Sequence, residues 1–255
     1  MSTDAELFGT IAAGYASARP PVHPRVIERV RAHLGIDEPL GSALDVGCGS
    51  GLSTRPLQRL ARHCLGIDPS AQMLRLGTRV APEARFAVAR AEALPVRPGS
   101  VDLITAAGSL NYADLDGFFS EAVRVLSAAG VLVVYDFSPG RRLRNSGALE
   151  EWFSELLARY PAPRDSHRRE LDTDTLRREP SGLRLTGSER FEIGLSLDQA
   201  FYEDYLMTET NIAHAVQAGT PEAEIRAWCH DALSPIFAGV EREVLFEGYV
   251  AYMAI

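Results

Sequence analysis

Short apolar runs alternate with amphipathic segments along the first half of the chain. Between the apolar runs, the hydrophobic residues recur at helical spacing and often follow a Ser or Thr that suits a helix start. The expected strands are 42–47, 64–68, 84–89, 101–107 and 131–137, and the expected helices are 53–63, 70–80 and 114–126. Strands that alternate with helices predict a parallel sheet with right-handed crossovers, and so an α/β protein.

Helices are also predicted ahead of this region, over 5–18 and 23–34, separated by an Arg-Pro-Pro sequence that cannot continue a helix. The last part of the chain predicts a strand from residue 191, then helical sequence including 221–237. One long strand or a strand pair is expected over 242–254.

Residues 139–190 interrupt the alternation. Nine arginines and seven acidic residues lie between Arg141 and Arg178, around one amphipathic helix expected within 149–160. The segment has no apolar core of its own, so we interpret it as an insertion or cap. Its arginines could bind a carboxylate or phosphate, but the interleaved acidic residues favour a solvated surface.

The composition is that of a globular protein, with 46% hydrophobic residues and a net charge of −8. An acidic balance argues against a general nucleic-acid or membrane binder. No secretory signal and no apolar stretch of membrane-spanning length is seen, and the three cysteines have no CxxC spacing, which disfavours a metal site. We expect a soluble, cytoplasmic protein with reduced thiols and a small-molecule partner.

A glycine-rich segment follows the first expected strand. Asp45, Gly47, Gly49 and Gly51 form D-x-G-x-G-x-G between a strand and a helix. Glycines let the loop backbone approach a ligand at the carboxyl end of the strand. Leu52 replaces the last glycine of the dinucleotide fingerprint G-x-G-x-x-G, and the Gly-Lys-Ser/Thr of a phosphate-binding P-loop is absent.

Asp68 ends the second expected strand, 17 residues beyond Gly51. Its carboxylate can accept two hydrogen bonds from the hydroxyls of a ribose. Alone, it could equally be a turn-forming Asp. Together with the glycine loop and the strand–helix–strand frame, it indicates a nucleoside ligand.

Four stretches resemble, in order and spacing, the motifs of class I S-adenosylmethionine-dependent methyltransferases. The likeness is to the small-molecule branch that includes ubiquinone/menaquinone and trans-aconitate methyltransferases. The stretches are LDVGCGSG, GIDPSAQML, AEALPVRPGSVDLITAAGSLNY and AVRVLSAAGVLVVYDF, within 40–137.

The resemblance implies a single domain over 1–255 with a doubly wound, seven-stranded Rossmann-like sheet of order 3-2-1-4-5-7-6, its last strand antiparallel. An N-terminal helical lid (1–40), a cofactor-binding core (41–138), an insertion after strand 5 (139–190) and a closing strand–helix–strand (191–255) would make up the domain.

The resemblance also implies the cofactor residues. The glycine loop would line the methionine part of S-adenosylmethionine, Asp45 would fix the loop and the amino group, Asp68 would hold the ribose, and Met73 would pack on the adenine. The expected set is Tyr15, Arg19, Asp45, Gly47, Cys48, Gly49, Gly51, Asp68, Pro69, Met73, Ala91, Glu92 and Ala107.

One adenine contact departs from the family pattern. Relatives carry an acidic residue after the third strand, where this chain has Arg90, which cannot accept from the exocyclic amine. The N–H of Ala91 could still bond the ring, with Glu92 as a substitute acid. Ala107 would touch the cofactor through its backbone.

Asn111 and Tyr112 stand where relatives often have a histidine or arginine and an aromatic residue. Asn111 could orient a nucleophile by hydrogen bonding, but an amide is no general base. The candidate catalytic residues are Asn111, Tyr15 and His167, and the further candidate bases are Glu209 and His214.

The candidate substrate residues are Asn111, Tyr112, Tyr202, Tyr205 and Glu209. Ordinary roles compete with several of these assignments. Tyr202 and Tyr205 lie three apart on one helix face, which favours packing, and Tyr15 suits lid or core equally. His167 suits a solvated surface, and His214 suits a packed or capping histidine.

The expected reaction is methyl transfer to oxygen, nitrogen or carbon of a small molecule. A sulfonium methyl is already electrophilic, so an in-line displacement needs mainly positioning, and an ionised acceptor needs no base. Two alternatives are a non-catalytic S-adenosylmethionine- or S-adenosylhomocysteine-binding module, favoured by Arg90, and a nicotinamide oxidoreductase, disfavoured by Leu52. The acidic charge disfavours a macromolecular substrate.

Overall fold

The computed structural model describes residues 17–161, 171–178 and 182–255, which form two compact units. Of the described residues, the sheet unit comprises 21–137, 171–178, 182–191 and 248–255, and the helical unit comprises 17–20, 138–161 and 192–247. The chain passes between them several times, twice within a strand. The partition of a single domain into lid, core, insertion and closing segment remains a prediction.

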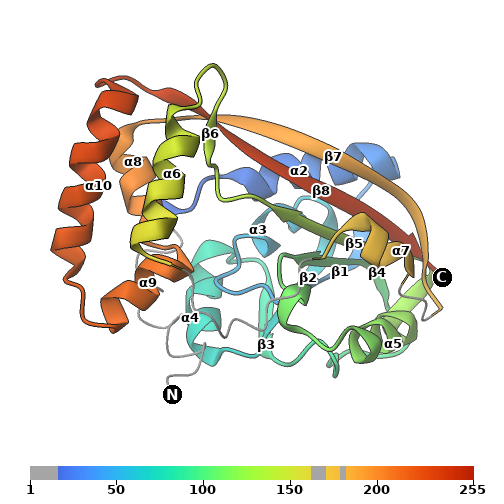
Figure 1. Cartoon of the computed structure of the whole chain (residues 1–255). Coiled ribbons are helices and arrows are strands. Elements are labelled where there is room, and N and C mark those ends of the chain that lie inside the picture. Colours follow the sequence, from blue (N-terminus) through green and yellow to red (C-terminus); the bar gives the residue numbers. More distant parts are fainter. Residues whose placement is uncertain (1–16, 162–170, 179–181) are drawn as a thin grey trace. The chain divides into compact units, whose positions relative to one another are not determined.

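Parallel strands form the centre of the sheet unit (Figure 1). They lie in the order β3-β2-β1-β4-β5, and the end of β8 pairs with β5 in the antiparallel direction. The strands are β1 (Leu40–Val46), β2 (Ala61–Asp68), β3 (Arg85–Val88), β4 (Val101–Ala107), β5 (Leu126–Phe137) and β8 (Arg242–Ala254). The expected α/β class is confirmed.

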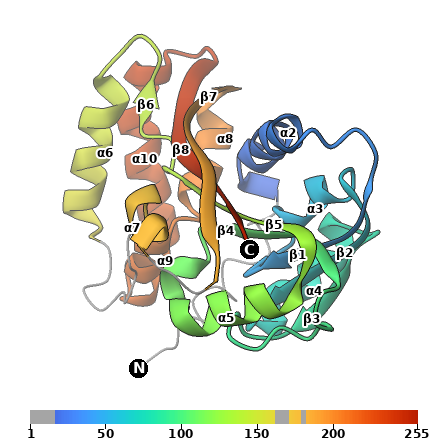
Figure 2. The same cartoon turned by 90° about the vertical axis from the view of Figure 1, so that its right-hand side faces the viewer.

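Helix α3 contacts β2, α4 contacts β2 and β3, and α5 contacts β5 (Figure 2). The helices of this unit are α2 (Val22–Leu34), α3 (Thr54–Leu57), α4 (Ala71–Val80), the short η1 (Leu110–Tyr112), α5 (Leu115–Val125) and α7 (Thr173–Arg178). Apolar strand residues and the buried faces of the helices share one core, in which Ile104, Phe118 and Leu132 have no exposed surface. Covered strands of this kind read as continuous apolar runs, which explains the sequence pattern.

Local signals set several helix ends. The Ser70 side chain accepts a hydrogen bond from the N–H of Met73 at 3.3 Å and caps α4. Gly35 ends α2 in the left-handed conformation, as its φ of 61° shows. The predicted helix over 23–34 is therefore confirmed, whereas the one over 5–18 falls mostly outside the described residues.

The predicted helix over 53–63 is wrong. Helix α3 stops at Leu57, and the N–H groups of residues 58–60 bond three residues back instead of four. Strand β2 starts at Ala61, because Ala61 pairs with Leu40 of β1 and the N–H of Leu40 donates to the carbonyl of Leu60 at 2.8 Å. Strand pairing therefore overrides helical spacing here.

The helical unit holds α6 (Ala148–Arg159), α8 (Gln199–Leu206), α9 (Thr210–Gln217) and α10 (Glu222–Phe237). Helix α10 contacts both α6 and α8 (Figure 1). Aromatic rings fill the space between these helices: Trp152 stacks on Trp228 at 5.7 Å, and Tyr202 lies against Trp152 and Phe237. Residues 139–161 therefore share a core with 192–247.

The second half of the expected insertion belongs to the sheet unit. Strand β7 (Arg184–Leu197) begins seven residues before the predicted start and pairs with β8. A two-residue strand, β6 (Arg142–Leu143), also pairs with β8, so the described sheet has eight strands rather than the expected seven. None of the described helices is long and apolar enough to cross a membrane.

Candidate functional site

Four chain segments meet at the carboxyl edge of the parallel strands. The glycine loop follows β1, Asp68 ends β2, Asn111 follows β4, and Asp136 is the next-to-last residue of β5. Because β1, β2, β4 and β5 pair in parallel, their carboxyl ends share one edge. Ligands of open α/β sheets bind at this edge.

The three loop glycines all adopt left-handed backbone conformations, with φ of 69° at Gly47, 53° at Gly49 and 86° at Gly51. A Cβ on Gly47 would lie 2.2 Å from the Cβ of Ser109, and a Cβ on Gly51 would lie 3.1 Å from the Phe86 ring. Gly47 is thus required by the protein's own packing, Gly51 is closely packed, and all three positions favour glycine by their backbone conformation, besides any ligand contact.

The carboxylate of Asp45 anchors the glycine loop. It has no exposed surface, and its carboxylate accepts hydrogen bonds from the hydroxyls of Ser53 (2.6 Å), Thr54 (2.6 Å) and Thr105 (2.8 Å). Burial raises its pKa, the three hydroxyls counteract this in part, and Asp68 adds to the rise. These bonds hold β1, β4 and α3 together, so they suit the loop-fixing role expected of Asp45 rather than a contact with an amino group.

Asp68 ties the loop to the end of β2. One carboxylate oxygen accepts from the N–H of Gly49 at 2.9 Å and the other from the N–H of Ser70 at 2.8 Å. Burial raises its pKa, and the two N–H groups counteract the rise. Each oxygen has a second lone pair, so the carboxylate can still accept from a ribose.

Two polar groups of the edge suit a nucleoside-type ligand. The Ser50 hydroxyl inside the loop is buried and has no hydrogen-bond partner among the described residues. The N–H of Ala91 likewise donates to no group in the described part of the chain. The unpartnered buried hydroxyl of Ser50 is costly, and a polar ligand would satisfy it, while the half-buried Ala91 N–H remains available to a ligand. The loop, Asp68 and these groups fit the methionine, ribose and adenine parts of S-adenosylmethionine.

The adenine side departs from the family pattern as expected. Arg90 is exposed and bonds Glu92 at 3.3 Å. Glu92 also accepts from the N–H of Asp114 at 2.9 Å; partial burial raises its pKa, but this bond and Arg90 lower it overall. The Glu92 carboxylate is therefore already bonded to Arg90 and to the backbone at the start of α5. The role proposed for Glu92 as a substitute acid finds no support in these contacts.

Other predicted cofactor residues lie along the same edge. The Met73 methyl lies 3.4 Å from where a Cβ on Gly49 would be, so Met73 lines the loop. Pro69 is exposed, and Ala107 is half-buried opposite Tyr135 of β5. Burial raises the pKa of the Cys48 thiol far above its usual range, which makes it a packing residue rather than a nucleophile.

Asn111 is buried after β4. Its side-chain amide donates to a carboxylate oxygen of Asp136 at 3.1 Å and to the carbonyl of Gly108 at 3.4 Å. Tyr112, next to it, is 51% exposed. In this structure the Asn111 amide therefore positions a carboxylate, and the predicted role of Asn111 in orienting a nucleophile stays a prediction.

The remaining predicted residues lie in the helical unit. Arg19 pairs with Glu209 at 3.1 Å, donates to the carbonyl of Thr208 at 2.9 Å, and lies over the ring of Tyr205. Tyr202 is buried and donates its hydroxyl to the carbonyl of Gly140 at 2.8 Å. These contacts favour the packing role of both tyrosines.

Two candidate catalytic residues, Tyr15 and His167, lie outside the described residues. The candidate base His214 is exposed on α9. Asp136 was not among the candidates, although it stands at the end of the apolar run VLVVYDF. A carboxylate that closes a buried parallel strand was the available signal, because such strand ends face the ligand.

Comparisons with known proteins find similarity to methyltransferases. Residues 44–134 match the family model described as "Methyltransferase domain". A solved structure of a candidate type II methyltransferase from Anaeromyxobacter dehalogenans superposes over 92% of this chain and 95% of its own, with a TM-score of 0.68 and 25% identity.

Curated relatives match over shorter spans. A candidate methyltransferase from Dictyostelium discoideum is 26% identical over 68% of this chain and 65% of its own length. The demethylmenaquinone methyltransferase of Tropheryma whipplei is 36% identical over 48% of this chain and 49% of its own. The chain thus spans less than two thirds of the curated relatives it matches.

Proposed function

We propose that this chain is a class I S-adenosylmethionine-dependent methyltransferase that methylates an oxygen, nitrogen or carbon atom of a small-molecule acceptor; the match of residues 44–134 to the methyltransferase-domain model supports this. S-adenosylmethionine, when bound, supplies an electrophilic methyl group. The observation that carries the proposal is the glycine loop that Asp45 and Asp68 hold at the carboxyl edge of the sheet.

The residues of the chain would do the positioning. Asp68 would accept from the ribose hydroxyls while it keeps its bond to Gly49, and the Ser50 hydroxyl would bond the polar methionine end. Ala91 would donate its N–H to the adenine ring. Holding the two reactants near attack distance can lower the barrier by about 7–11 kcal/mol at best.

The direct test is calorimetric titration with S-adenosylmethionine, S-adenosylhomocysteine and NADH. We expect both adenosyl compounds to bind and NADH to bind weakly or not at all. Asp68→Ala should weaken binding by about 10- to 100-fold, because it removes charge-assisted bonds worth about 1.5–3 kcal/mol. Glu83→Ala, which removes an exposed carboxylate of the same unit, is the matched control and should bind like the wild type.

Two outcomes would contradict the proposal: NADH binding without a response to the adenosyl compounds, and full affinity in Asp68→Ala. A binding module without catalysis is the second candidate, favoured by Arg90 at the adenine position. Release of S-adenosylhomocysteine in the presence of an acceptor panel separates the two.

A further inference from the structure

Asp136 occupies a position at the carboxyl edge that the sequence motifs did not assign. Ala107 of β4 pairs with Tyr135 of β5, so Asp136 lies just beyond the end of β4, where the turn to Asn111 begins. Gly108 and Ser109 follow β4 and lead into the short helix η1. Ser109 donates its hydroxyl to the carbonyl of Val46 at 2.6 Å, immediately before the glycine loop. Asp136 therefore shares one edge with the segment that would hold the methyl donor.

The carboxylate of Asp136 is held in one orientation. One oxygen accepts from the Asn111 amide at 3.1 Å, and the other accepts from the N–H of Phe137 at 2.8 Å. Gly108 makes room for it, because a Cβ at this position would lie 2.9 Å from the Asp136 carboxylate. Asp136 is nonetheless only half-buried. A half-buried, oriented carboxylate beside a ligand-binding edge has the geometry of a general base.

Two phenols lie near Asp136. Tyr135 precedes it on β5 and bonds His23 at 2.8 Å, and Tyr249 of β8 stands opposite Asp136 in the antiparallel pair. Burial raises the pKa of both phenols. Nearby carboxylates raise it further: Asp45 and Asp136 for Tyr135, and Asp136 and Asp172 for Tyr249. Both phenols therefore stay protonated at neutral pH, so neither competes with a carboxylate as a proton acceptor.

We propose that Asp136, oriented by Asn111, is the general base of the reaction and that the acceptor is a protic O–H or N–H group. This inference rests on the proposed function. The acceptor atom uses its own electron pair to bond the methyl carbon while the methyl–sulfur bond breaks and leaves its pair on sulfur. The acceptor proton moves to an Asp136 oxygen and leaves to solvent with the product.

The proposal narrows the acceptor class. An ionised carboxylic acid has no proton to give, so a base beside it would serve no purpose. Alcohols, phenols and amines do have one, and proton removal during attack contributes about 10²- to 10⁴-fold in comparable sites. The acceptor is therefore expected among these three groups of compounds.

The test measures S-adenosylhomocysteine formation from a panel of alcohols, phenols, amines and carboxylic acids. Asp136→Asn, which keeps the shape and removes the base, should lower kcat with a protic acceptor by about 100-fold or more. Asn111→Ala should give a smaller loss, because the carboxylate stays but is less well oriented. Asp116→Asn, on the exposed side of α5, is the charge-matched control and should retain wild-type turnover.

Two readouts separate a base from a structural residue. The affinity for S-adenosylhomocysteine, measured by calorimetry, should be the same in Asp136→Asn and wild type. The deficit in rate should shrink as the pH approaches the pKa of the acceptor itself, where the acceptor ionises in solution. A merely structural role would leave the deficit constant with pH.

Four outcomes would each overturn the inference: an unchanged rate in Asp136→Asn, a rate deficit that does not depend on pH, turnover with carboxylic acids only, or no turnover with any protic acceptor. If S-adenosylhomocysteine does not bind the wild type, the proposed function itself fails. Because that binding is measured first, the two failures are distinguishable.

Discussion

At the residue scale, Asp45 shows how a buried charge shapes the site. Its carboxylate has no contact with water and depends on three hydroxyls, two of them from Ser53 and Thr54 just after the glycine loop. Hydrogen bonds to a charged group contribute about 1.5–3 kcal/mol each, and an unsatisfied buried partner is costly. Asp45 therefore fixes the loop that it precedes.

Asp45→Asn should lower the free energy of unfolding by about 1–3 kcal/mol, since the amide cannot accept all three bonds. The loss should be larger at about pH 4 than at about pH 8. Folding raises the pKa of Asp45 above its ordinary 3.8, so the stability that Asp45 contributes is complete below that value and falls as the pH rises through the folded pKa. Urea unfolding at both pH values measures this.

Asp116→Asn serves as the control for this experiment, because its carboxylate is exposed. Surface changes of this kind usually stay within about 0.5 kcal/mol. An Asp45→Asn protein as stable as the wild type at both pH values would contradict the anchoring role.

The positions of the glycine loop and of Asp68 were predicted from the sequence. One reason for the glycines, their packing against other parts of the protein, was not. Sequence reasoning attributed them to a ligand, whereas Gly47 lies against Ser109 and Gly51 against Phe86. These partners are distant in the chain, so their proximity depends on the sheet order. Asp136 was missed for the same reason, since its partner Asn111 lies on another strand end.

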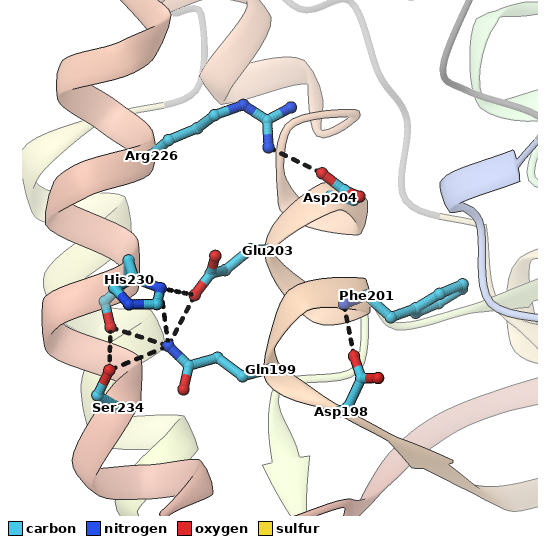
Figure 3. Close-up of polar contacts among 8 residues, drawn as sticks. All are labelled: Asp198, Gln199, Phe201, Glu203, Asp204, Arg226, His230 and Ser234. Atoms are coloured by element: carbon cyan, nitrogen blue, oxygen red, sulfur yellow. Dashed lines mark hydrogen bonds and ion pairs between the residues drawn. The ribbon is translucent and has the colours of Figure 1, made fainter. Parts of the chain in front are cut away.

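At the element scale, helices α8 and α10 are joined by a polar bridge (Figure 3). The Gln199 amide donates to a Glu203 oxygen at 2.7 Å and to the carbonyl of His230 at 2.9 Å, and His230 lies 3.0 Å from Glu203. A separate ion pair joins Arg226 to Asp204 at 2.8 Å. The bridge therefore joins α8 to α10, and Tyr202 and Tyr205 of α8 are buried.

Gln199→Ala should lower the free energy of unfolding by about 1 kcal/mol, because the inter-helix hydrogen bonds are lost. Gln217→Ala, at the exposed end of α9, is the matched control and should change the stability by less than about 0.5 kcal/mol. Denaturant unfolding followed by the fluorescence of Trp152 and Trp228 reports on this unit. Equal effects of the two substitutions would show that the bridge contributes nothing.

Element types were predictable where the apolar pattern was strong, and element ends were less so. The sequence of β2 from Ala61 to His63 reads as helix because Leu57 and Leu60 have helical spacing. Its strand state comes from pairing with β1, which no local pattern reveals. The start of β7 at Arg184 was not predicted either. Most of its first residues are exposed or half-buried, so they show no apolar pattern that would indicate a strand.

At the scale of the whole molecule, the candidate cofactor loop lies in the sheet unit and the aromatic core in the helical unit. A ligand stabilises the part of a protein that binds it, by about 2.7 kcal/mol at 100 times the dissociation constant. S-adenosylhomocysteine should therefore slow hydrogen exchange in peptides covering 44–54 and 66–73. A peptide covering 222–237 should change little.

Mass spectrometry resolves these peptides, and NADH at the same concentration is the control ligand. Slowing confined to 222–237 would place the binding site elsewhere. Slowing of equal size in all three peptides would show that the two units open together rather than separately.

The burial of every cysteine has a practical consequence. Cys48, Cys64 and Cys229 are free and buried, and burial raises the pKa of Cys64 to about 11 and of Cys229 to about 12. Thiolates, which react with maleimides, are scarce at such sites. A single cysteine introduced by Tyr112→Cys, at a position 51% exposed, would accept a fluorescent dye beside Asn111. Because the natural thiols would react slowly, the dye would label the introduced cysteine selectively, and its fluorescence could report acceptor binding.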